Sequence, residues 1–320
     1  MMSNSHVVIT GGAGFVGSHL AVALLRQGHR VTVIDNMSTG SYDNLGPCYD
    51  FPGFWLKQGD IAHPTSLTGL KDVSAVVHLA CPASPVWYQR MPIQTLRAGS
   101  LGTFNALSLA DQFDARIVLA SSSEVYGDPK VHPQPETYVG AIDPIGPRAS
   151  YDVAKLFLEA TAAAYRESKY VRCGIVRPFN VYGPHMRPED GRVVPSFCAE
   201  ALRGNNLQIH NGGTQTRSLL YIDDAVDAIV AMLGCEEFGP VNIGSTDEVT
   251  IGHLAETIVA LAGSGSLTIT EGRAHDPGVR CPDVTRAQQL LGWKATTCLE
   301  DGLSRTLDWM RGYVSKADCA

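Results

Sequence analysis

The sequence predicts an α/β protein, with a doubly wound parallel sheet covered by helices and a smaller C-terminal domain. Two observations support this fold class. Short runs of β-branched and other apolar residues alternate with segments in which apolar residues recur at helical spacing. The short runs are apolar almost throughout, as is typical of parallel strands that helices cover on both faces. At 320 residues the chain is long enough for about two units of ~150 residues.

The first elements predicted are a strand, a loop and a helix. Residues 6–10 read HVVIT, a β-branched run that ends in glycines, and apolar residues recur at helical spacing from Phe15. Gly28 stands where a left-handed residue would end this helix, and a second strand follows over 31–35. Further strands are predicted over 75–80, 116–121 and 173–178, and helices near 92–112 and 150–169.

The second half of the chain has a different texture. Pro, Gly and Asn become frequent and the elements become shorter, so we predict a first domain over 1–178 and a substrate domain over 179–320. A helix predicted over 222–233 and a strand predicted over 240–244 do not fit this simple division of the chain. We expect elements near 216–244 to return to the first domain.

Composition and charge exclude several classes of function. The chain has 25 Lys and Arg against 32 Asp and Glu, a net charge of −7, so neither nucleic acid nor an anionic membrane is an expected partner. Its 8 cysteines are scattered with no C-x-x-C pair, which predicts reduced thiols and no metal site. No secretory signal or membrane-spanning run is seen, so we expect a cytoplasmic location.

The loop after the first strand carries the first functional signal. Gly11, Gly14 and Gly17 lie between a strand and a helix, where backbone N–H groups and the helix N-terminus can hold a pyrophosphate. Asp35 ends the second strand, where a carboxylate can bind both hydroxyls of an adenosine ribose. It would repel a 2′-phosphate, and no cation follows it, so NAD is expected rather than NADP. The further cofactor-binding candidates are Phe15, Val16, Asn36, Asp60, Ile61, Leu79, Ala80, Tyr151, Lys155 and Pro178.

A second signal is typical of an oxidoreductase centre. Tyr151 and Lys155 are spaced i and i+4, so on a helix they lie on one face. An ammonium group beside a phenol favours the phenolate, and we expect it to lower the pKa of the tyrosine toward that of a general base. Ser122 follows a predicted strand and can reach the same reacting oxygen.

With these residues, nearly the whole chain resembles the extended short-chain dehydrogenase/reductase family. The resemblance implies a Rossmann domain that holds NAD and a smaller domain that holds a nucleotide sugar. It makes Tyr151 the base that takes the proton of the sugar 4-hydroxyl, with Lys155 tuning that base and binding the nicotinamide ribose. It makes Ser122 a hydrogen-bond partner of the reacting oxygen. It also implies a homodimer in which the helices near 92–112 and 150–169 form a four-helix bundle.

Several stretches resemble the UDP-glucuronate decarboxylase branch of this family. They are 78–85 (HLACPASP), 123–129 (SEVYGDP), 146–152 (GPRASYD), 190–194 (DGRVV) and 215–217 (QTR). The Pro-Ala-Ser-Pro loop discriminates best between branches. The expected reaction is NAD-dependent decarboxylation of UDP-glucuronate through a 4-keto intermediate to UDP-xylose, because a ketone at carbon 4 accepts the electrons that carbon dioxide leaves behind.

The same resemblance supplies candidates around the substrate. Glu124 is expected to assist reprotonation or to hold the sugar ring, alongside Ser122, Tyr151 and Lys155 as the catalytic candidates. The expected substrate-binding residues are Ser84, Tyr88, Asn180, Gln215, Arg217 and Arg280. The two arginines suit a diphosphate because guanidinium groups bind phosphate oxygens in pairs.

The chain departs from the family at a few positions. Residues 152–155 read DVAK where the family usually reads Asp-Glu-Gly-Lys, Gly99 replaces a common asparagine, and Leu219 replaces a Phe. These changes leave Tyr151 and Lys155 in place. They lead us to expect that some UDP-4-keto-pentose escapes before it is reduced.

Two other functions remain open from the sequence. A UDP-glucuronate 4-epimerase, or another nucleotide-sugar epimerase or dehydratase, would use the same oxidation without losing carbon dioxide. A non-catalytic scaffold that binds NAD is the other alternative. The intact set of Ser122, Tyr151 and Lys155 argues against the scaffold.

Overall fold

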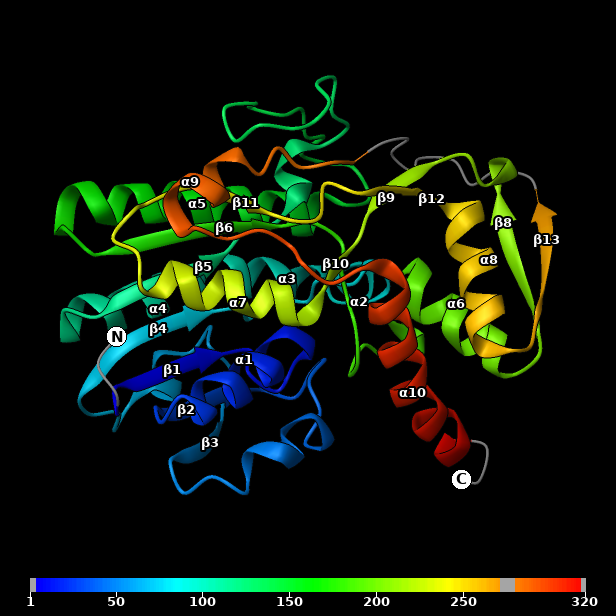
Figure 1. Ribbon diagram of the computed structural model, residues 1–320. Helices are drawn as coiled ribbons and strands as arrows, with labels where there is room; N and C mark the ends of the chain where they lie inside the picture. Colours follow the sequence, from blue (N-terminus) through cyan, green and yellow to red (C-terminus); the bar gives the residue numbers. More distant parts are fainter. Residues whose placement is uncertain (1–3, 271–279, 318–320) are drawn as a thin grey trace.

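A computed structural model describes residues 4–270 and 280–317 (Figure 1). Its centre is a seven-stranded sheet in the order β11-β6-β5-β4-β1-β2-β3, and every neighbouring pair is parallel. The strands are β1 (His6–Thr10), β2 (Arg30–Asp35), β3 (Phe54–Gln58), β4 (Val73–His78), β5 (Arg116–Ala120), β6 (Cys173–Pro178) and β11 (Val241–Ile243). The predicted Rossmann-type α/β sheet is confirmed.

The degree to which each strand is buried explains which strands could be predicted from the sequence. Every residue of β1 and β5 is buried, so these strands read as continuous apolar runs. The edge strand β3 was not predicted. Its residues are only partly buried and Trp55 is half exposed, so an uninterrupted apolar run is missing.

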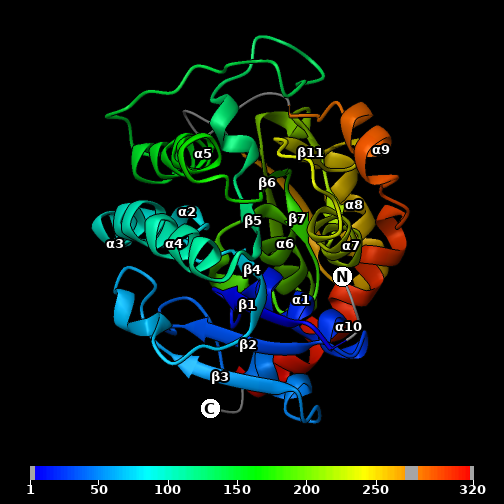
Figure 2. The same cartoon turned by 90° about the vertical axis from the view of Figure 1, so that its left-hand side faces the viewer.

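Helices cover both faces of the sheet (Figure 2). One face carries α3 (Pro92–Arg97), α4 (Thr103–Phe113) and α5 (Ala149–Lys169), and the other carries α1 (Phe15–Arg26), α7 (Ile222–Leu233) and α9 (Thr285–Leu291). Alternate residues of β1 enter different cores, with Val8 on the side of α4 and α5 and Val7 on the side of α1 and α7. The segment predicted as one helix over 92–112 is interrupted by a π-helical turn at Ala98–Gly102.

The remaining elements lie beyond one end of the sheet (Figure 1). They are the helices α2 (Pro85–Arg90), α6 (Val193–Leu202), α8 (Ile251–Ala262) and α10 (Leu299–Ala317), and three strand pairs: β7 (Val181–Tyr182) with β10 (Leu220–Tyr221), β9 (Thr216–Ser218) with β12 (Glu248–Thr250), and β8 (Asn206–His210) with β13 (Ser266–Thr270). Between them in sequence, α7 and β11 lie with the main sheet, where β11 pairs with β6. The division of the chain at residue 178 stays a prediction.

Three further features concern the described residues alone. None of their helices is both long and apolar enough to span a lipid bilayer. No group of three or more His, Cys, Asp and Glu side chains is arranged to hold a metal ion. All seven cysteines in this part of the chain are free thiols.

A buried ion pair fixes α5 against the sheet. Arg177 on β6 donates from Nε and Nη2 to the two carboxylate oxygens of Glu159, at 2.8 and 2.7 Å. Ser121 Oγ, just beyond β5, donates to the same carboxylate at 2.5 Å. Both charged side chains are 15% exposed or less, so neither has water as a ready substitute partner.

We therefore expect Glu159→Gln to destabilise the protein by about 3–5 kcal/mol, because it leaves the Arg177 charge buried without a counter-charge. Urea denaturation followed by circular dichroism measures this change. Glu167→Gln, at an exposed position of α5, is the matched control and should change the free energy of unfolding by less than about 0.5 kcal/mol. Equal effects of the two substitutions would contradict the assignment.

Candidate active site

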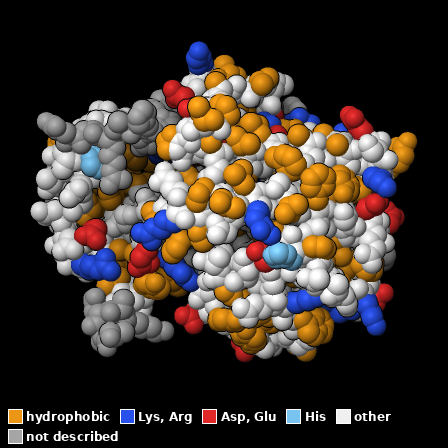
Figure 3. Space-filling model, turned by 180° about the vertical axis from the view of Figure 1, so that it is seen from behind, with side chains coloured by type: hydrophobic (Ala, Val, Ile, Leu, Met, Phe, Trp, Pro, Cys, Tyr) orange, Lys and Arg blue, Asp and Glu red, His pale blue; other side chains and the backbone are white. Residues whose placement is uncertain are grey.

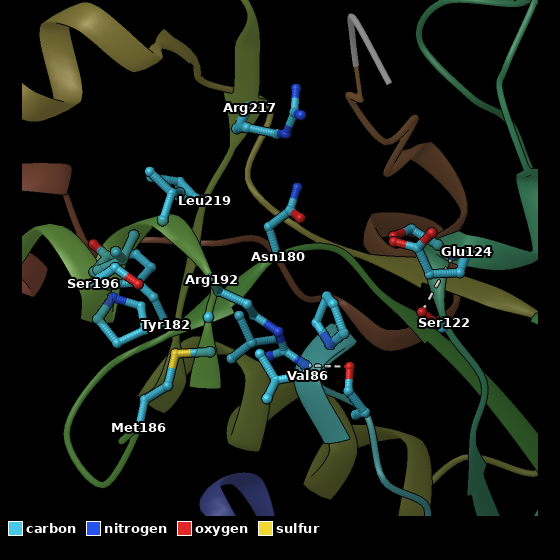
Figure 4. Close-up of a pocket in the computed structure, with 18 of the residues that line it drawn as sticks. Val86, Ser122, Glu124, Asn180, Tyr182, Met186, Arg192, Ser196, Arg217 and Leu219 are labelled. Carbon is cyan, nitrogen blue, oxygen red and sulfur yellow. Dashed lines mark hydrogen bonds between the residues drawn. The ribbon is translucent and has the colours of Figure 1, made fainter. Parts of the chain in front are cut away.

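A pocket of about 950 Å³ lies at the carboxyl ends of the central strands (Figure 4). One wall consists of the segments that follow β4, β5 and β6, and the opposite wall comes from α6, β8, β9 and the loop before α6. In open α/β sheets this edge is where ligands bind, because successive strands diverge there into loops of different direction.

The glycine loop is packed so closely against the protein that a side chain would not fit at two of its positions. Gly11 has a φ of +73°, and a Cβ there would lie 2.7 Å from the backbone of Ala80. A Cβ at Gly17 would lie 2.4 Å from the carbonyl oxygen of Gly11. Gly14 is the N-cap of α1, whose first N–H groups have no partner within the helix. This cradle fits the pyrophosphate of a dinucleotide.

Asp35 lies beside this cradle, at the end of β2. Its Oδ2 accepts from Ala13 N at 2.9 Å and its Oδ1 accepts from Met37 N at 2.8 Å. Burial raises the pKa of Asp35, and the two N–H groups act in the opposite sense. Each carboxylate oxygen keeps a free lone pair that a ribose hydroxyl can use.

The other predicted cofactor residues divide into two groups. Asn36 and Asp60 each cap their own turn, since Asn36 Oδ1 accepts from Ser38 N at 3.0 Å and Asp60 Oδ1 accepts from Ala62 N at 2.8 Å. Ile61 is buried and lies outside the pocket lining. The residues that line the pocket are Phe15, Val16, Leu79, Tyr151, Lys155 and Pro178.

Tyr151 and Lys155 enter the pocket from the first turns of α5. Lys155 is 4% exposed and donates from Nζ to the carbonyl oxygen of Ala120 at 2.7 Å. Burial lowers the pKa of Lys155, while Glu159 opposes this shift. The expected lowering of the Tyr151 pKa is wrong for this geometry. Burial raises the pKa, Glu124 acts in the same direction, and a hydrogen bond with Ser122 and the charge of Arg192 oppose them without reversing the shift.

Glu124 is held between two arginines. Arg148 Nη2 donates to one carboxylate oxygen and Arg280 Nη1 donates to the other. Burial alone would raise the pKa of Glu124, but the two guanidinium groups outweigh it and lower the pKa. Sequence reasoning missed Arg148, although the GPRASYD stretch that contains it was singled out.

Two predicted substrate-binding residues belong to the Pro-Ala-Ser-Pro loop and to the helix α2 that follows it. Ser84 donates to the carbonyl oxygen of Asp190 at 2.5 Å, so its hydroxyl joins two loops at the rim of the pocket. Tyr88 stacks on Tyr151 with ring centroids 5.2 Å apart and planes 11° from parallel. Among the described residues its buried hydroxyl has no hydrogen-bond partner, which leaves it available to a ligand.

The remaining polar candidates lie across the pocket from Glu124 (Figure 4). Arg217 is on β9 and Gln215 directly precedes that strand, while Asn180 lies in the turn between β6 and β7 and donates from Nδ2 to the carbonyl oxygen of Ser218 at 3.2 Å. Arg192 lies below Asn180 in Figure 4 and donates to the carbonyl oxygen of Ala83 at 2.7 Å. Arg192 was not predicted as a site residue, because the residues beside it in the sequence do not indicate whether its side chain enters a pocket or faces solvent.

The family is decided by comparison with known proteins. The model of the "NAD dependent epimerase/dehydratase family" matches residues 7–244. The chain belongs to this family. Its curated relatives include UDP-glucuronic acid decarboxylase 5 of Arabidopsis thaliana, 44% identical over 94% of this chain and 88% of that protein. UDP-glucuronic acid decarboxylase 1 of Xenopus tropicalis is 43% identical over 95% of this chain and 72% of that protein.

Solved structures of the family have the same fold. UDP-glucose 4-epimerase of Thermotoga maritima, crystallised with UDP-glucose, superposes with a TM-score of 0.88 at 28% identity, over 97% of this chain and 99% of that one. The dTDP-glucose 4,6-dehydratase DesIV of Streptomyces venezuelae, which holds NAD, has a TM-score of 0.86 at 27% identity, over 97% and 98% of the two chains.

The two arginines on Glu124 lead to a pH prediction. In Arg148→Met, Glu124 loses one of its two positive partners, so its pKa rises and it ionises only at higher pH. We expect the acid limb of the turnover profile to move to higher pH and the maximal turnover to fall by about tenfold or more.

Turnover measured from pH 4 to 9 checks this prediction. Arg172→Met is the control, because Arg172 pairs with the exposed Asp114 and Glu236 and all three lie outside the pocket lining. An unmoved acid limb in Arg148→Met would show that Glu124 does not depend on this guanidinium group.

Proposed function

We propose that this protein decarboxylates UDP-glucuronate, using NAD that is regenerated in each turnover. The observation that carries the proposal is the grouping of Ser122, Glu124, Tyr151 and Lys155 in one pocket of a chain 44% identical to a UDP-glucuronic acid decarboxylase. The Pro-Ala-Ser-Pro loop at the rim of this pocket agrees with it.

The charges of the pocket suit such a substrate. Arg148, Arg192, Arg217 and Arg280 line it, although the chain as a whole has a net charge of −7. A sugar nucleotide with a diphosphate and a carboxylate carries several negative charges that these guanidinium groups can bind. We assign Arg217 and Arg280, with Asn180 and Gln215, to the nucleotide and diphosphate, and Tyr88 to the sugar carboxylate. Ser84 would bind this carboxylate as well only by giving up its hydrogen bond to Asp190.

NAD is favoured over NADP by Asp35. Its carboxylate lies beside the glycine cradle and would meet a 2′-phosphate with like charge. Asn36 and Met37, which follow it, carry no positive charge that would offset this repulsion. When bound, NAD supplies the hydride acceptor for the oxidation and the hydride donor for the later reduction.

The side chains then have distinct tasks. Tyr151 takes the proton of the sugar 4-hydroxyl, and Ser122, its hydrogen-bond partner, holds the reacting oxygen. Burial alone keeps the Tyr151 phenol protonated, so its action as a base depends on positive charge beside it. The Lys155 ammonium group lies 5.5 Å from the centre of the Tyr151 ring, and the nicotinamide ring of bound NAD would add a second positive charge. The resulting 4-ketone is β to the carboxylate, so the carbon–carboxylate bond breaks with its electron pair delocalised onto the ketone oxygen. Glu124 is kept ionised by its arginines, so we assign it to ordering the water or sugar group that delivers the proton back to carbon 5.

Incubation of the protein with UDP-glucuronate and NAD tests the function. We expect release of carbon dioxide and formation of UDP-xylose, together with some UDP-4-keto-pentose, identified by mass spectrometry and NMR. Tyr151→Phe should lower turnover by about a hundredfold or more, because it removes the base that starts the reaction.

Each product distinguishes a different function. UDP-galacturonate without carbon dioxide would identify a 4-epimerase instead. UDP-xylose alone would contradict the escape of the keto sugar. Unchanged turnover in Tyr151→Phe would contradict the assigned base, and binding of NAD with no turnover of any nucleotide sugar would favour the scaffold.

We also propose that two chains pair through the face that carries α3, α4 and α5. This face is seen in Figure 3 and carries exposed apolar side chains, with Ile93 69% and Phe104 41% exposed. Phe104 and Phe157 from neighbouring helices make an edge contact and line a shallow hollow on this face. Burying these groups against a second copy would remove apolar surface from water.

Phe157→Glu should therefore shift the protein from dimer to monomer, because it places a charge in the proposed contact. Light scattering coupled to size-exclusion chromatography measures the mass in solution. The control is Tyr170→Glu, at an exposed residue just beyond α5, which should leave the mass unchanged. A wild-type protein that is monomeric at micromolar concentration would contradict the proposal.

A further inference from the structure

The π-helical turn Ala98–Gly102 packs tightly against α5 where Gly99 faces Ala154. A Cβ built at Gly99 would lie 2.5 Å from the Cβ of Ala154 and 3.1 Å from its Cα. Real Cβ atoms do not approach other atoms so closely, and the Ala154 methyl group has no rotamer by which to move aside. Ala154 is 2% exposed and Gly99 is buried. Only one of the two positions can carry a side chain in this packing.

The turn cannot retreat easily, because it is fixed on its other side. Thr103 Oγ1 donates to the carbonyl oxygen of Gly99 at 2.7 Å and lies 3.4 Å from His78 Nε2. His78 Nδ1 lies 2.7 Å from Thr10 Oγ1 at the end of β1. All three polar side chains are buried, so this chain of contacts ties the turn to β1 and β4.

This contact joins two positions that are 55 residues apart in the sequence. Nothing local to either residue connects Gly99 with Ala154, and only the packing of the turn against α5 brings them together.

We propose that Gly99 and Ala154 form one steric pair that positions Lys155. Ala154 precedes Lys155 on α5, and Lys155 Nζ reaches the carbonyl oxygen of Ala120 across the site. The distance between α5 and the turn therefore sets where this ammonium group stands. The part of the proposal that concerns Lys155 rests on the proposed function, and the steric part does not.

A double-mutant cycle tests the pair. The variants are Gly99→Ala, Ala154→Gly and the double substitution, with Ala163→Gly as a control for losing a methyl group elsewhere on α5. We expect Gly99→Ala alone to lower the melting temperature and to cut turnover by about tenfold or more, since small displacements of positioned groups are costly. The double variant should return to within about threefold of Ala154→Gly, because it relieves the contact.

A second readout separates positioning from simple destabilisation. In Gly99→Ala the pH profile of turnover should shift with displacement of Lys155, and in the double variant it should return to the profile of Ala154→Gly. A second comparison uses Gly99→Asn and the double variant Gly99→Asn/Ala154→Gly, which place a larger side chain at the same contact. We expect the Ala154→Gly change to restore stability and turnover here as well.

Several outcomes would overturn the proposal. Independent effects, in which the double variant is as impaired as the two single changes predict together, would exclude a steric pair. Normal stability and turnover in Gly99→Ala would do the same. If Gly99→Ala is insoluble, a soluble double variant supports the pair and an insoluble one contradicts it. If UDP-glucuronate is not the substrate, the melting temperatures still test whether Gly99 and Ala154 form a steric pair. If the double variant regains stability but not the pH profile, the pair does not position Lys155.

Discussion

The burial of the Lys155 ammonium group is the constraint on which the rest of the site depends. A charge that is 4% exposed needs a fixed polar partner, and the carbonyl oxygen of Ala120 at the end of β5 provides it. This contact requires α5 to lie close against the sheet. The Glu159–Arg177 ion pair meets that requirement one turn later on the same helix, and the Gly99–Ala154 contact meets it from the side of the π-helical turn.

The second organising feature is the balance of charge in the pocket. Four arginines line a pocket in a chain that is acidic as a whole, and Glu124 contacts two of them, so its single negative charge offsets one of their two positive charges. These contacts hold Arg280 and Arg148 in place and offset part of the cost of removing them from water, until another anion competes for them. The same side chains can therefore serve both the stability of the site and the binding of a negatively charged substrate.

Much of the fold follows from local signals, and its failures have local reasons. Strands buried on both faces read as apolar runs, so β1, β2, β5 and β6 were predicted near their observed positions. The edge strand β3 is half exposed and was missed. The break between α3 and α4 was missed as well, because the residues that flank the π-helical turn keep right-handed helical φ/ψ angles and its i→i+5 hydrogen bonds have no signature in the sequence.

The class of sheet, the glycine cradle with Asp35 and the helix that presents Tyr151 and Lys155 could all be predicted from the sequence, because each depends on residues within about one supersecondary unit. Which charges meet depends on how these units pack together. Arg148 and Arg280 lie 132 residues apart, yet both bind Glu124, and Arg192 reaches the pocket by bonding to Ala83 in a distant loop. The tertiary structure also overturned the expected pKa of Tyr151, because burial depends on the whole packed site. Spacing along the chain encodes which side chains share an element, whereas desolvation and long-range pairing depend on how the elements pack.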